Sequence, residues 1–321
     1  MAKGRTVVAL GGNALARASG GGTWEEAVVQ MRRTAPALAQ VVAEGHELLL
    51  THGNGPQVGM SLRQNEIAQR EVPVRPLDVI GAETQGQIGY LIQQELTPAL
   101  AAAGVPRTVL GFVSRMLVSR KDPAFRRPTK PIGQFYSETE ARVLHKSKGW
   151  VMVHDVARGG WRRVVPSPRP ILWVEGEVVR ELLRAGFGER WVPVLAGGGG
   201  IPVVERGRGR YEGVEAVIDK DLGAAVVAKV VGADTLAIVT DVPAVAIGFR
   251  RPWEQWLGEV GAGEMKGYLE RGEFGEGSMA PKVLAALEFL SDGGQRVVIT
   301  DPTTLGRALR GEAGTRIRRS N

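Results

Sequence analysis

The stretch Thr6-Val7-Val8-Ala9-Leu10-Gly11-Gly12-Asn13 sets the pattern of the chain, because a short apolar run leads directly into a glycine turn. A longer amphipathic segment follows. Its first residues, Thr23-Trp24-Glu25-Glu26, have the spacing of a capping box, which predicts a helix beginning at Thr23. We expect Pro36 to kink or break this helix, because a proline inside a helix removes a backbone hydrogen bond.

The same succession of strand, turn and helix recurs along the sequence. Apolar runs predict further strands at residues 46–51, 108–113, 191–196, 235–240 and 296–300, of which the last is the final core strand. Helices are predicted at residues 78–103, 219–231 and 279–290. Apolar strands that alternate with helices favour a mainly parallel sheet covered on both faces, so the predicted fold class is α/β.

Residues 120–170 interrupt this rhythm. The segment is rich in Pro, Arg and Lys and has weak periodicity. A stretch of this length inside an α/β domain is more typical of an inserted subdomain or lid than of a linker.

Composition excludes several classes of protein. Of the 321 residues, 43% are hydrophobic and 23% are charged, as in globular proteins, and the length fits one two-lobed domain or two joined ones. The sequence contains neither an apolar run long enough to span a membrane nor the apolar core of a signal peptide. The absence of Cys excludes disulfides, thiolate metal sites and Cys nucleophiles. We therefore expect a soluble cytoplasmic protein without a membrane partner.

The net charge of +7 raises the question of a nucleic-acid partner. The basic residues are scattered, however, with short clusters at residues 158–163, 206–210 and 316–319, and only 6% of residues are aromatic. This pattern favours a solvated basic surface that also suits anionic substrates, and no nucleic-acid partner is expected.

Glycine is the sharper signal, at 44 of 321 residues against a usual share of about 7%. Three glycine turns follow predicted strands: Gly11-Gly12-Asn13, Gly53-Asn54-Gly55 and Gly197-Gly198-Gly199-Gly200. One such turn is an ordinary connection, but three at equivalent places indicate an anion site at the carboxyl ends of the strands. None has the spacing of a P-loop or of a dinucleotide-binding fingerprint.

Three of the nine lysines have unusual surroundings. Lys130 lies between Pro128 and Pro131, and Lys282 follows a proline suited to the first turn of a helix. Lys220 begins a predicted helix, where a cation opposes the helix dipole unless an anion is bound. Asp221 could hold lysines in place or simply belong to the first helical turn.

Other catalytic patterns are weak or absent from the sequence. His52 follows the second strand, but we interpret it as structural because it belongs to no metal-binding spacing. The nucleophile elbow of Ser hydrolases is not found, and no metal-ligand cage is visible.

Together these segments resemble the carbamate kinases of the amino acid kinase superfamily, and the resemblance runs from end to end. It rests on long motifs in the family's order: Val8-Ala9-Leu10-Gly11-Gly12-Asn13-Ala14, Thr51-His52-Gly53-Asn54-Gly55-Pro56-Gln57-Val58-Gly59, Thr84-Gln85-Gly86-Gln87-Ile88-Gly89-Tyr90, Pro128-Thr129-Lys130-Pro131-Ile132-Gly133, Val164-Val165-Pro166-Ser167-Pro168, Val217-Ile218-Asp219-Lys220-Asp221-Leu222, Thr240-Asp241-Val242 and Gly277-Ser278-Met279.

The resemblance implies a three-layer αβα sandwich with a small protruding subdomain at about residues 120–170, usually in a homodimer. It implies that residues 1–190 bind carbamate and the transferred phosphoryl group, and that residues 191–321 bind nucleotide. The implied reaction is reversible phosphoryl transfer between ATP and carbamate with Mg²⁺ held through the nucleotide phosphates. The expected small-molecule partners are therefore ATP or ADP and carbamate or carbamoyl phosphate, and many family members make ATP in arginine breakdown.

The resemblance also assigns the site residue by residue. The catalytic residues would be Lys130, Lys220, Lys282 and Asp221. The substrate and phosphoryl group would be bound by Gly11, Gly12, Asn13, Gly53 and Asn54. The nucleotide would be bound by Gly198, Gly199, Thr240, Asp241, Val242 and Met279. No metal ligand from the protein is expected.

The sequence departs from the family pattern at Gln134, at Pro243-Ala244 and at Ala280, which affects the lid and the shape of the adenine pocket. The alternative reactions are those of another amino acid kinase that uses a larger carboxylate such as acetylglutamate. A catalytically silent, ligand-binding relative is the alternative outside the enzymes.

Overall fold

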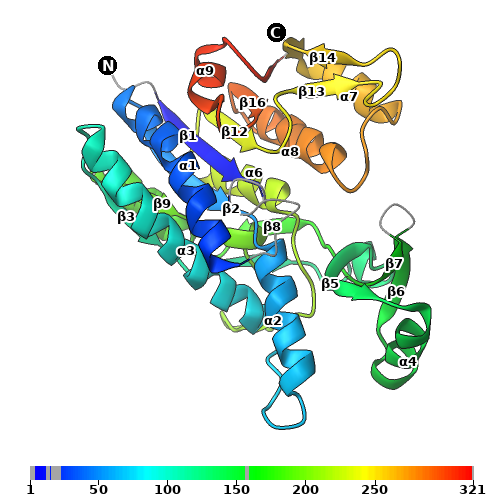
Figure 1. Ribbon diagram of the computed structural model, residues 1–321. Coiled ribbons are helices and arrows are strands. Elements are labelled where there is room, and N and C mark those ends of the chain that lie inside the picture. The colour runs from blue at the N-terminus through cyan, green and yellow to red at the C-terminus, as the bar shows by residue number, and fades with distance from the viewer. Residues whose placement is uncertain (1–3, 12–14, 16–22, 156–158, 320–321) are drawn as a thin grey trace.

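A computed structural model describes residues 4–11, 15, 23–155 and 159–319, and its main body contains an eight-stranded sheet (Figure 1). Among the paired strands of this sheet, only β16 (Arg296–Thr300) and β17 (Thr315–Arg318) run antiparallel to each other. The expected α/β class with a mainly parallel sheet is confirmed. In spatial order the strands are β15 (Glu259–Gly261), β17 (Thr315–Arg318), β16 (Arg296–Thr300), β12 (Thr235–Val239), β1 (Arg5–Leu10), β2 (Glu47–His52), β9 (Trp191–Val194) and β3 (Thr108–Gly111).

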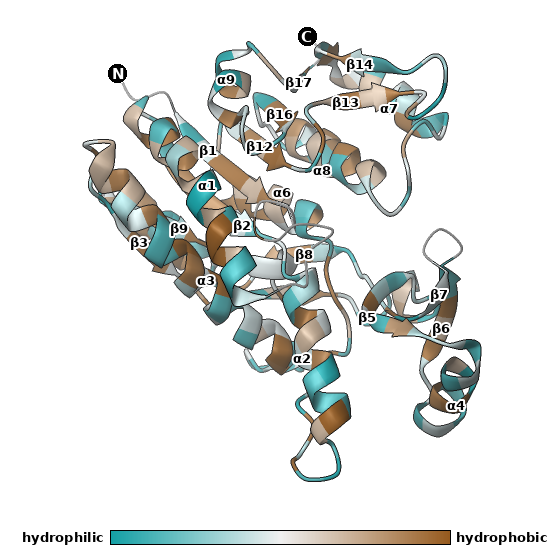
Figure 2. Ribbon diagram, viewed as in Figure 1, coloured by the Kyte–Doolittle hydropathy of each residue, from teal (hydrophilic) through white to brown (hydrophobic). Residues whose placement is uncertain are grey.

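Helices cover both faces of this sheet and make three layers (Figure 1). Successive residues of β1 alternate between the faces, since Val8 and Leu10 join one apolar core and Val7 and Ala9 join the other. The first core includes α1 (Trp24–Ala43), α3 (Leu77–Ala102) and α9 (Leu305–Arg310), and the second includes α5 (Gly176–Arg184), α6 (Lys220–Val230), α7 (Ala262–Glu270) and α8 (Met279–Ser291). Figure 2 shows β1 and β12 as strongly hydrophobic strands between these helices.

Smaller sheets and short helices complete the described chain. A four-stranded sheet contains β11 (Tyr211–Gly213), β10 (Ile201–Glu205), β4 (Arg115–Val118) and β8 (Pro170–Trp173). A hairpin pairs β13 (Val245–Ile247) with β14 (Gln255–Leu257). The remaining helical elements are α2 (Gly55–Ala68), η2 (Pro123–Phe125), η3 (Phe187–Glu189) and η4 (Gly197–Gly199).

Within residues 120–170, an antiparallel three-stranded sheet and a helix form a small unit that projects from the main body (Figure 1). This small sheet unit consists of β5 (Lys130–Tyr136), α4 (Glu138–Lys148), β6 (Val151–Asp155) and β7 (Gly160–Val165). Few of its apolar side chains are buried, and β6 has none that is fully buried. Because so little of it faces a core, its sequence shows little periodicity.

Helix α1 begins as predicted but does not end where we expected it to. The Thr23 side chain accepts a hydrogen bond from the Glu26 amide, and the Glu26 carboxylate accepts one from the Thr23 amide. Of the expected kink or break at Pro36, the break is wrong, since the helix continues to Ala43. The neighbouring Ala35 and Leu38 are fully buried, and this packing offsets the backbone hydrogen bond that proline removes.

The prediction that residues 296–300 form the last core strand is also wrong. β17 follows and pairs with both β16 and β15. Its Thr315 and Ile317 are fully buried, whereas the intervening Arg316 and the following Arg318 face outward. The arginines led us to interpret this segment as a solvated basic cluster, although its alternation is that of a half-buried strand. In the described residues, no helix is both long and apolar enough to cross a membrane.

Candidate active site

The predicted glycine turns lie together at the carboxyl edge of the main sheet. The Gly53 amide donates to the Leu10 carbonyl at 2.9 Å, and the Gly11 amide donates to the Val239 carbonyl at 2.8 Å. The ends of β1, β2 and β12 therefore meet at one place, as expected of parallel strands. Gly12 and Asn13, which belong to the first turn, lie outside the described residues.

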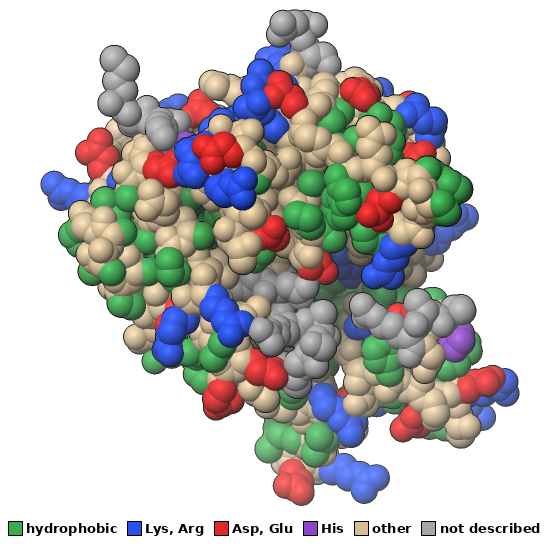
Figure 3. Space-filling model, turned by 45° about the horizontal axis from the view of Figure 1, so that its top comes forward, with side chains coloured by type: hydrophobic (Ala, Val, Ile, Leu, Met, Phe, Trp, Pro, Cys, Tyr) green, Lys and Arg blue, Asp and Glu red, His purple; other side chains and the backbone are tan. Residues whose placement is uncertain are grey.

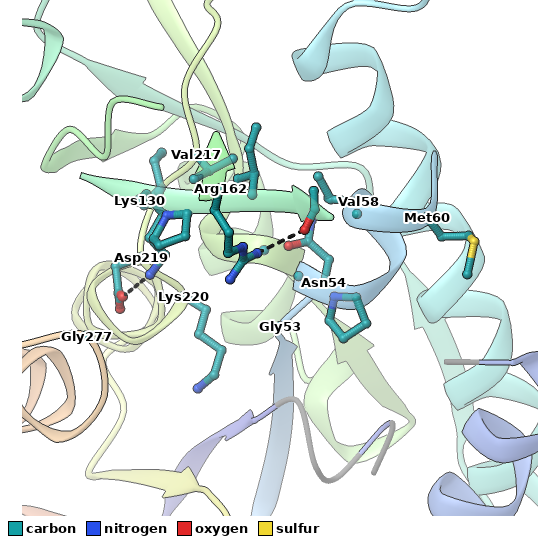
Figure 4. Close-up of a pocket in the computed structure, with 18 of the residues that line it drawn as sticks. Gly53, Asn54, Val58, Met60, Lys130, Arg162, Val217, Asp219, Lys220 and Gly277 are labelled. Carbon is teal, nitrogen blue, oxygen red and sulfur yellow. Dashed lines mark hydrogen bonds and ion pairs between the residues drawn. The ribbon is translucent and has the colours of Figure 1, made fainter. Parts of the chain in front are cut away.

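A cavity of about 640 Å³ opens at this edge, beneath the small sheet unit (Figure 4). It brings together seven of the predicted site residues: Gly53, Asn54, Lys130, Gly198, Lys220, Asp221 and Lys282. Its lining contains five cationic side chains, including those of Arg63 and Arg162, against the two carboxylates of Asp219 and Asp221. This excess of positive charge in a concave site attracts anionic ligands.

Asp221 is the centre of the cation cluster. Its carboxylate accepts hydrogen bonds from Lys220 Nζ and from Lys282 Nζ, the second at 3.1 Å. The side chain of Asp221 is only 3% exposed, and those of the two lysines are about 15% exposed. One buried carboxylate thus holds two ammonium groups at the floor of the cavity, although they repel each other.

The charges in this cluster influence one another's protonation. Burial acts to raise the pKa of Asp221, but the two lysines outweigh it and hold that pKa below its usual value. Burial lowers the pKa of Lys220, the Lys282 charge lowers it further, and the Asp221 charge opposes both. A bound anion would oppose this shift, because it would favour the charged form of Lys220.

Lys130 reaches the cavity from the first residue of β5. Its Nζ donates a 2.8 Å hydrogen bond to Asp219 Oδ2 (Figure 4). Asp219 is the N-cap of α6, because its other oxygen accepts from the Asp221 amide at 3.0 Å. A lysine of the small sheet unit is therefore attached to the residue just before Lys220.

Asn54 is fixed by contacts on two sides. Its Nδ2 donates to Thr84 Oγ1 of α3 at 3.0 Å. On the other side lies Gly198, whose φ of 65° is in the left-handed region, and a Cβ at that residue would lie 2.2 Å from Asn54 Nδ2. The glycine-rich turn thus allows the Asn54 amide to pack directly on the backbone.

His52 is structural in this arrangement, as its sequence context indicated. The ring is buried, Nδ1 lies 3.1 Å from the Gly53 carbonyl oxygen, and a Cβ at Gly197 would lie 2.3 Å from the ring. Burial lowers the pKa of His52 to about 4, against a smaller opposing effect of the Gly53 carbonyl. The imidazole is therefore neutral near pH 7 and does not line the cavity.

Most of the predicted nucleotide residues do not line the cavity. Gly198 does, whereas Gly199, Thr240, Asp241, Val242 and Met279 are not among the described lining residues, and neither is Gly11. Thr240 is buried and its amide donates to the Thr300 carbonyl, which places it at the carboxyl end of β12. Met279 begins α8, the helix that also carries Lys282.

Three charged residues of the cavity lining were not predicted as site residues from the sequence. Asp219 carries a detectable signal, because an Asp before a helix is a typical N-cap. Arg63 shows no distinguishing pattern in α2. Arg162 lies in the basic cluster at residues 158–163 that we interpreted as solvated surface, yet it lines the cavity.

Gln134, where the sequence departs from the family pattern, has a structural role in this chain. Its Nε2 donates to Glu66 Oε2 of α2 at 3.1 Å, and the Tyr136 hydroxyl donates to the other oxygen of Glu66. The small sheet unit is thereby attached to α2, whose first residues border the cavity. Burial, followed by the hydrogen bond to Glu66, raises the pKa of Tyr136, so this hydroxyl stays protonated.

A lysine-rich cavity at the strand ends of a three-layer α/β fold suits anionic ligands such as phosphates. The amino acid kinase family matches residues 4–301, and the chain therefore belongs to this family and is a phosphotransferase. Within the family it is similar to carbamate kinases over nearly its whole length.

Three relatives illustrate this similarity. The carbamate kinase of Thermococcus kodakarensis is 46% identical, with 98% of each chain covered. That of Trichomonas vaginalis is also 46% identical, with 98% of this chain and 99% of the relative covered. The solved structure of carbamate kinase from Giardia lamblia bound to AMP-PNP is 38% identical, with 99% of each chain covered and a TM-score of 0.89.

Proposed function

We propose that the protein is a carbamate kinase that catalyses reversible phosphoryl transfer between ATP and carbamate. Towards ATP, the bond between phosphorus and the carbamate oxygen of carbamoyl phosphate breaks, and a bond forms between phosphorus and the terminal oxygen of ADP. The convergence of Lys130, Lys220 and Lys282 on one cavity carries the proposal. The similarity to carbamate kinases supports it.

The chemistry of carbamate suits this cavity. Carbamate is an anion, so its oxygen can attack phosphorus without a general base. Among the described lining residues there is no histidine, and both carboxylates are engaged by lysines. Phosphoryl transfer depends mainly on positioning and charge stabilisation, which fixed cations supply.

The lysines divide between two sides of the transferred group. Lys220 and Lys282, oriented by Asp221, bind phosphate oxygens and stabilise the charge of the transition state. Lys130 reaches the same group from the small sheet unit, which acts as a lid. Its contact with Asp219 keeps the ammonium group over the cavity before substrate binds. Ammonium groups suit this role because they are compact charges that can contact several oxygens.

The backbone turns supply the remaining contacts with the substrates. Gly53 and Asn54 bind carbamate, and Gly11, Gly12 and Asn13 bind the transferred phosphoryl group. Gly198 lines the cavity. We assign Gly198 and Gly199 to the binding of the nucleotide phosphates. Thr240, Asp241, Val242 and Met279 line the path of the nucleotide beyond the cavity, at the ends of β12 and at the start of α8.

We assign residues 1–190 to the carbamate half, including the lid at about residues 120–170, and residues 191–321 to the nucleotide half. The bound AMP-PNP in the Giardia lamblia carbamate kinase structure supports an ATP site of this kind. We further propose a cytoplasmic homodimer that makes ATP in arginine breakdown, as the resemblance to the family implies.

Mg²⁺ fits this site through the nucleotide phosphates. The described residues contain no group of three or more His, Cys, Asp or Glu side chains that could hold a metal. Mg²⁺ does not need such a cage, because it usually keeps several waters and binds phosphates with one or two carboxylates. Lysines engage both carboxylates of the cavity, Asp219 and Asp221, so the nucleotide phosphates and water would hold the ion. When bound, the ion neutralises phosphate charge.

We expect no nucleic-acid partner, and the distribution of charge agrees with this expectation. On the face shown in Figure 3, basic side chains are interspersed with acidic ones and do not form one continuous patch. Many arginines are paired with glutamates, as Arg32 is with Glu95 and Arg310 with Glu312. Such pairing lowers the local positive potential that nucleic acid would require.

A substrate panel tests the proposal. Purified protein is given Mg²⁺ and ADP with carbamoyl phosphate, and separately Mg²⁺ and ATP with carbamate or acetylglutamate. We expect ATP from carbamoyl phosphate and no phosphorylation of acetylglutamate. Turnover with acetylglutamate alone would assign the larger-carboxylate reaction instead. Nucleotide binding without turnover of any substrate would identify a silent relative.

A further inference from the structure

Arg162 is a second cation that the small sheet unit contributes to the cavity. It lies on β7, which pairs with β5, the strand that begins at Lys130. Both side chains line the cavity with Lys220 and Lys282. In the view of Figure 4 the Arg162 guanidinium is drawn between Lys130 and Asn54, and all three residues line the cavity.

The guanidinium is held in a defined orientation. Nη2 donates a 3.1 Å hydrogen bond to the Gly133 carbonyl, and the central carbon lies 5.1 Å from the centre of the Phe135 ring. A guanidinium has five N–H donors in one plane, and these two contacts fix that plane. The side chain is therefore arranged before a ligand arrives, which lowers the entropy lost on binding.

We propose that Arg162 is a substrate-binding residue that contacts the oxygen atoms of carbamoyl phosphate. This inference rests on the proposed function, which places the carbamoyl end at Asn54 and the phosphoryl end at Lys130. A cation that lines the same cavity as both ends can contact oxygens of the same substrate. The planar fork of a guanidinium can bind two such oxygens through parallel, bidentate hydrogen bonds, a fixed geometry that the point charge of a lysine does not impose.

The next residue along β7 provides a matched control. Arg163 points away from this cavity, as expected for adjacent residues of a strand, and its Nη2 donates to Glu215 at 2.7 Å. Its guanidinium carbon lies 4.3 Å from the centre of the Trp150 ring, and it lines a different cavity. Arg162 and Arg163 thus share residue type and strand but differ in their access to substrate.

Steady-state kinetics of ATP formation, with each substrate varied in turn, tests the proposal on wild type, Arg162→Met and Arg163→Met. In Arg162→Met we expect the KM for carbamoyl phosphate to rise roughly 10-fold or more, the scale of one charge-assisted hydrogen bond. The KM for ADP should stay within about twofold. In Arg163→Met the KM values for carbamoyl phosphate and for ADP should both stay near the wild-type values. The KM of Arg162→Lys for carbamoyl phosphate should lie between those of wild type and Arg162→Met.

Chemical rescue distinguishes substrate binding from support of the fold. Millimolar methylguanidinium should lower the KM of Arg162→Ala for carbamoyl phosphate and should leave Arg163→Ala unchanged. An unaltered KM for carbamoyl phosphate in Arg162→Met would overturn the proposal. A lower melting temperature with equal losses for both substrates and no rescue would also overturn it. An inactive wild type would instead refute the proposed function on which the inference rests.

Discussion

Lys130 Nζ lies 2.8 Å from Asp219 Oδ2, a contact between residues 89 positions apart in the sequence. It connects the first residue of β5 in the small sheet unit with the N-cap of α6 in the main body. Asp219 directly precedes Lys220, so the same turn positions a lysine from each side of the cavity. In the proposed reaction, an incoming phosphate competes with Asp219 for the Lys130 ammonium group.

The two carboxylate oxygens of Asp219 make different contacts, so substitutions can separate their effects on stability and on turnover. Oδ1 caps α6 and Oδ2 binds Lys130. Asp219→Asn keeps an oxygen that can cap the helix, whereas Asp219→Ala loses both contacts. We expect the free energy of unfolding of Asp219→Ala to be about 1 kcal/mol lower than that of Asp219→Asn, the typical contribution of an N-cap. Urea denaturation of both variants measures this difference.

Both variants should also turn over more slowly than wild type, because Lys130 loses the partner that keeps it over the cavity. Equal stability of Asp219→Ala and Asp219→Asn would contradict the capping role. Unchanged turnover in both variants would contradict the positioning role.

His52 should make the protein sensitive to acid. Its pKa is about 4 in the folded state, whereas an exposed histidine has a pKa near 6.5. Below about pH 6.5 the unfolded chain therefore binds a proton that the folded chain does not bind, and stability falls as the pH falls towards 4. The total loss from this one group is up to about 3 kcal/mol, and above pH 6.5 it contributes no slope.

The measurement compares urea unfolding of wild type and His52→Gln between pH 7.5 and 4.5. The substitution changes stability at every pH, so the informative quantity is the difference between the two pH slopes. Wild type should lose stability more steeply than His52→Gln below pH 6.5. Parallel curves would show that the buried imidazole does not titrate as described.

Gly198 should tolerate no side chain, for two separable reasons. Its φ of 65° costs a non-glycine residue roughly 1–2 kcal/mol, and a Cβ would lie 2.2 Å from Asn54 Nδ2. Gly104 offers a matched control, because its φ is 72° but a Cβ there would meet nothing within 4 Å. We expect both alanine variants to lose stability, and only Gly198→Ala to lose most of its activity, because Asn54 is displaced.

Thermal unfolding and kcat/KM for carbamoyl phosphate, measured on both glycine variants, test this expectation. A fully active Gly198→Ala would mean that the contact between the turn and Asn54 does not matter for the reaction. A comparable loss of activity in Gly104→Ala would attribute the effect to general destabilisation.

Local signals in the sequence predicted much of the fold. The strand at residues 6–10 and the capping box at Thr23 depend on neighbouring residues, and both are found in the structure. The continuation of α1 through Pro36 depends on burial against other elements, which no local pattern reveals. β17 was missed because its outward arginines hid an alternation that only pairing with β16 explains.

The site shows the same difference between local sequence signals and features that depend on packing between elements. Lys130, Lys220 and Lys282 were predicted from their unusual surroundings and from motifs, and the structure brings them to one cavity. Arg162 could not be distinguished from Arg163, because the face of β7 that meets the cavity depends on how the small sheet unit packs. The roles of all these residues remain predictions for the experiments above.

The most direct test of the central claim is ATP formation from ADP and carbamoyl phosphate with Mg²⁺, measured on wild type beside Lys130→Ala. We predict turnover by wild type and a kcat lower by on the order of 10²-fold or more in Lys130→Ala, the scale of a lost transition-state donor. The melting temperature of the variant should stay close to that of wild type, because Lys130 is partly exposed. Wild-type-like turnover in Lys130→Ala would contradict the role of this lysine, and a folded wild type without turnover would contradict the proposed reaction.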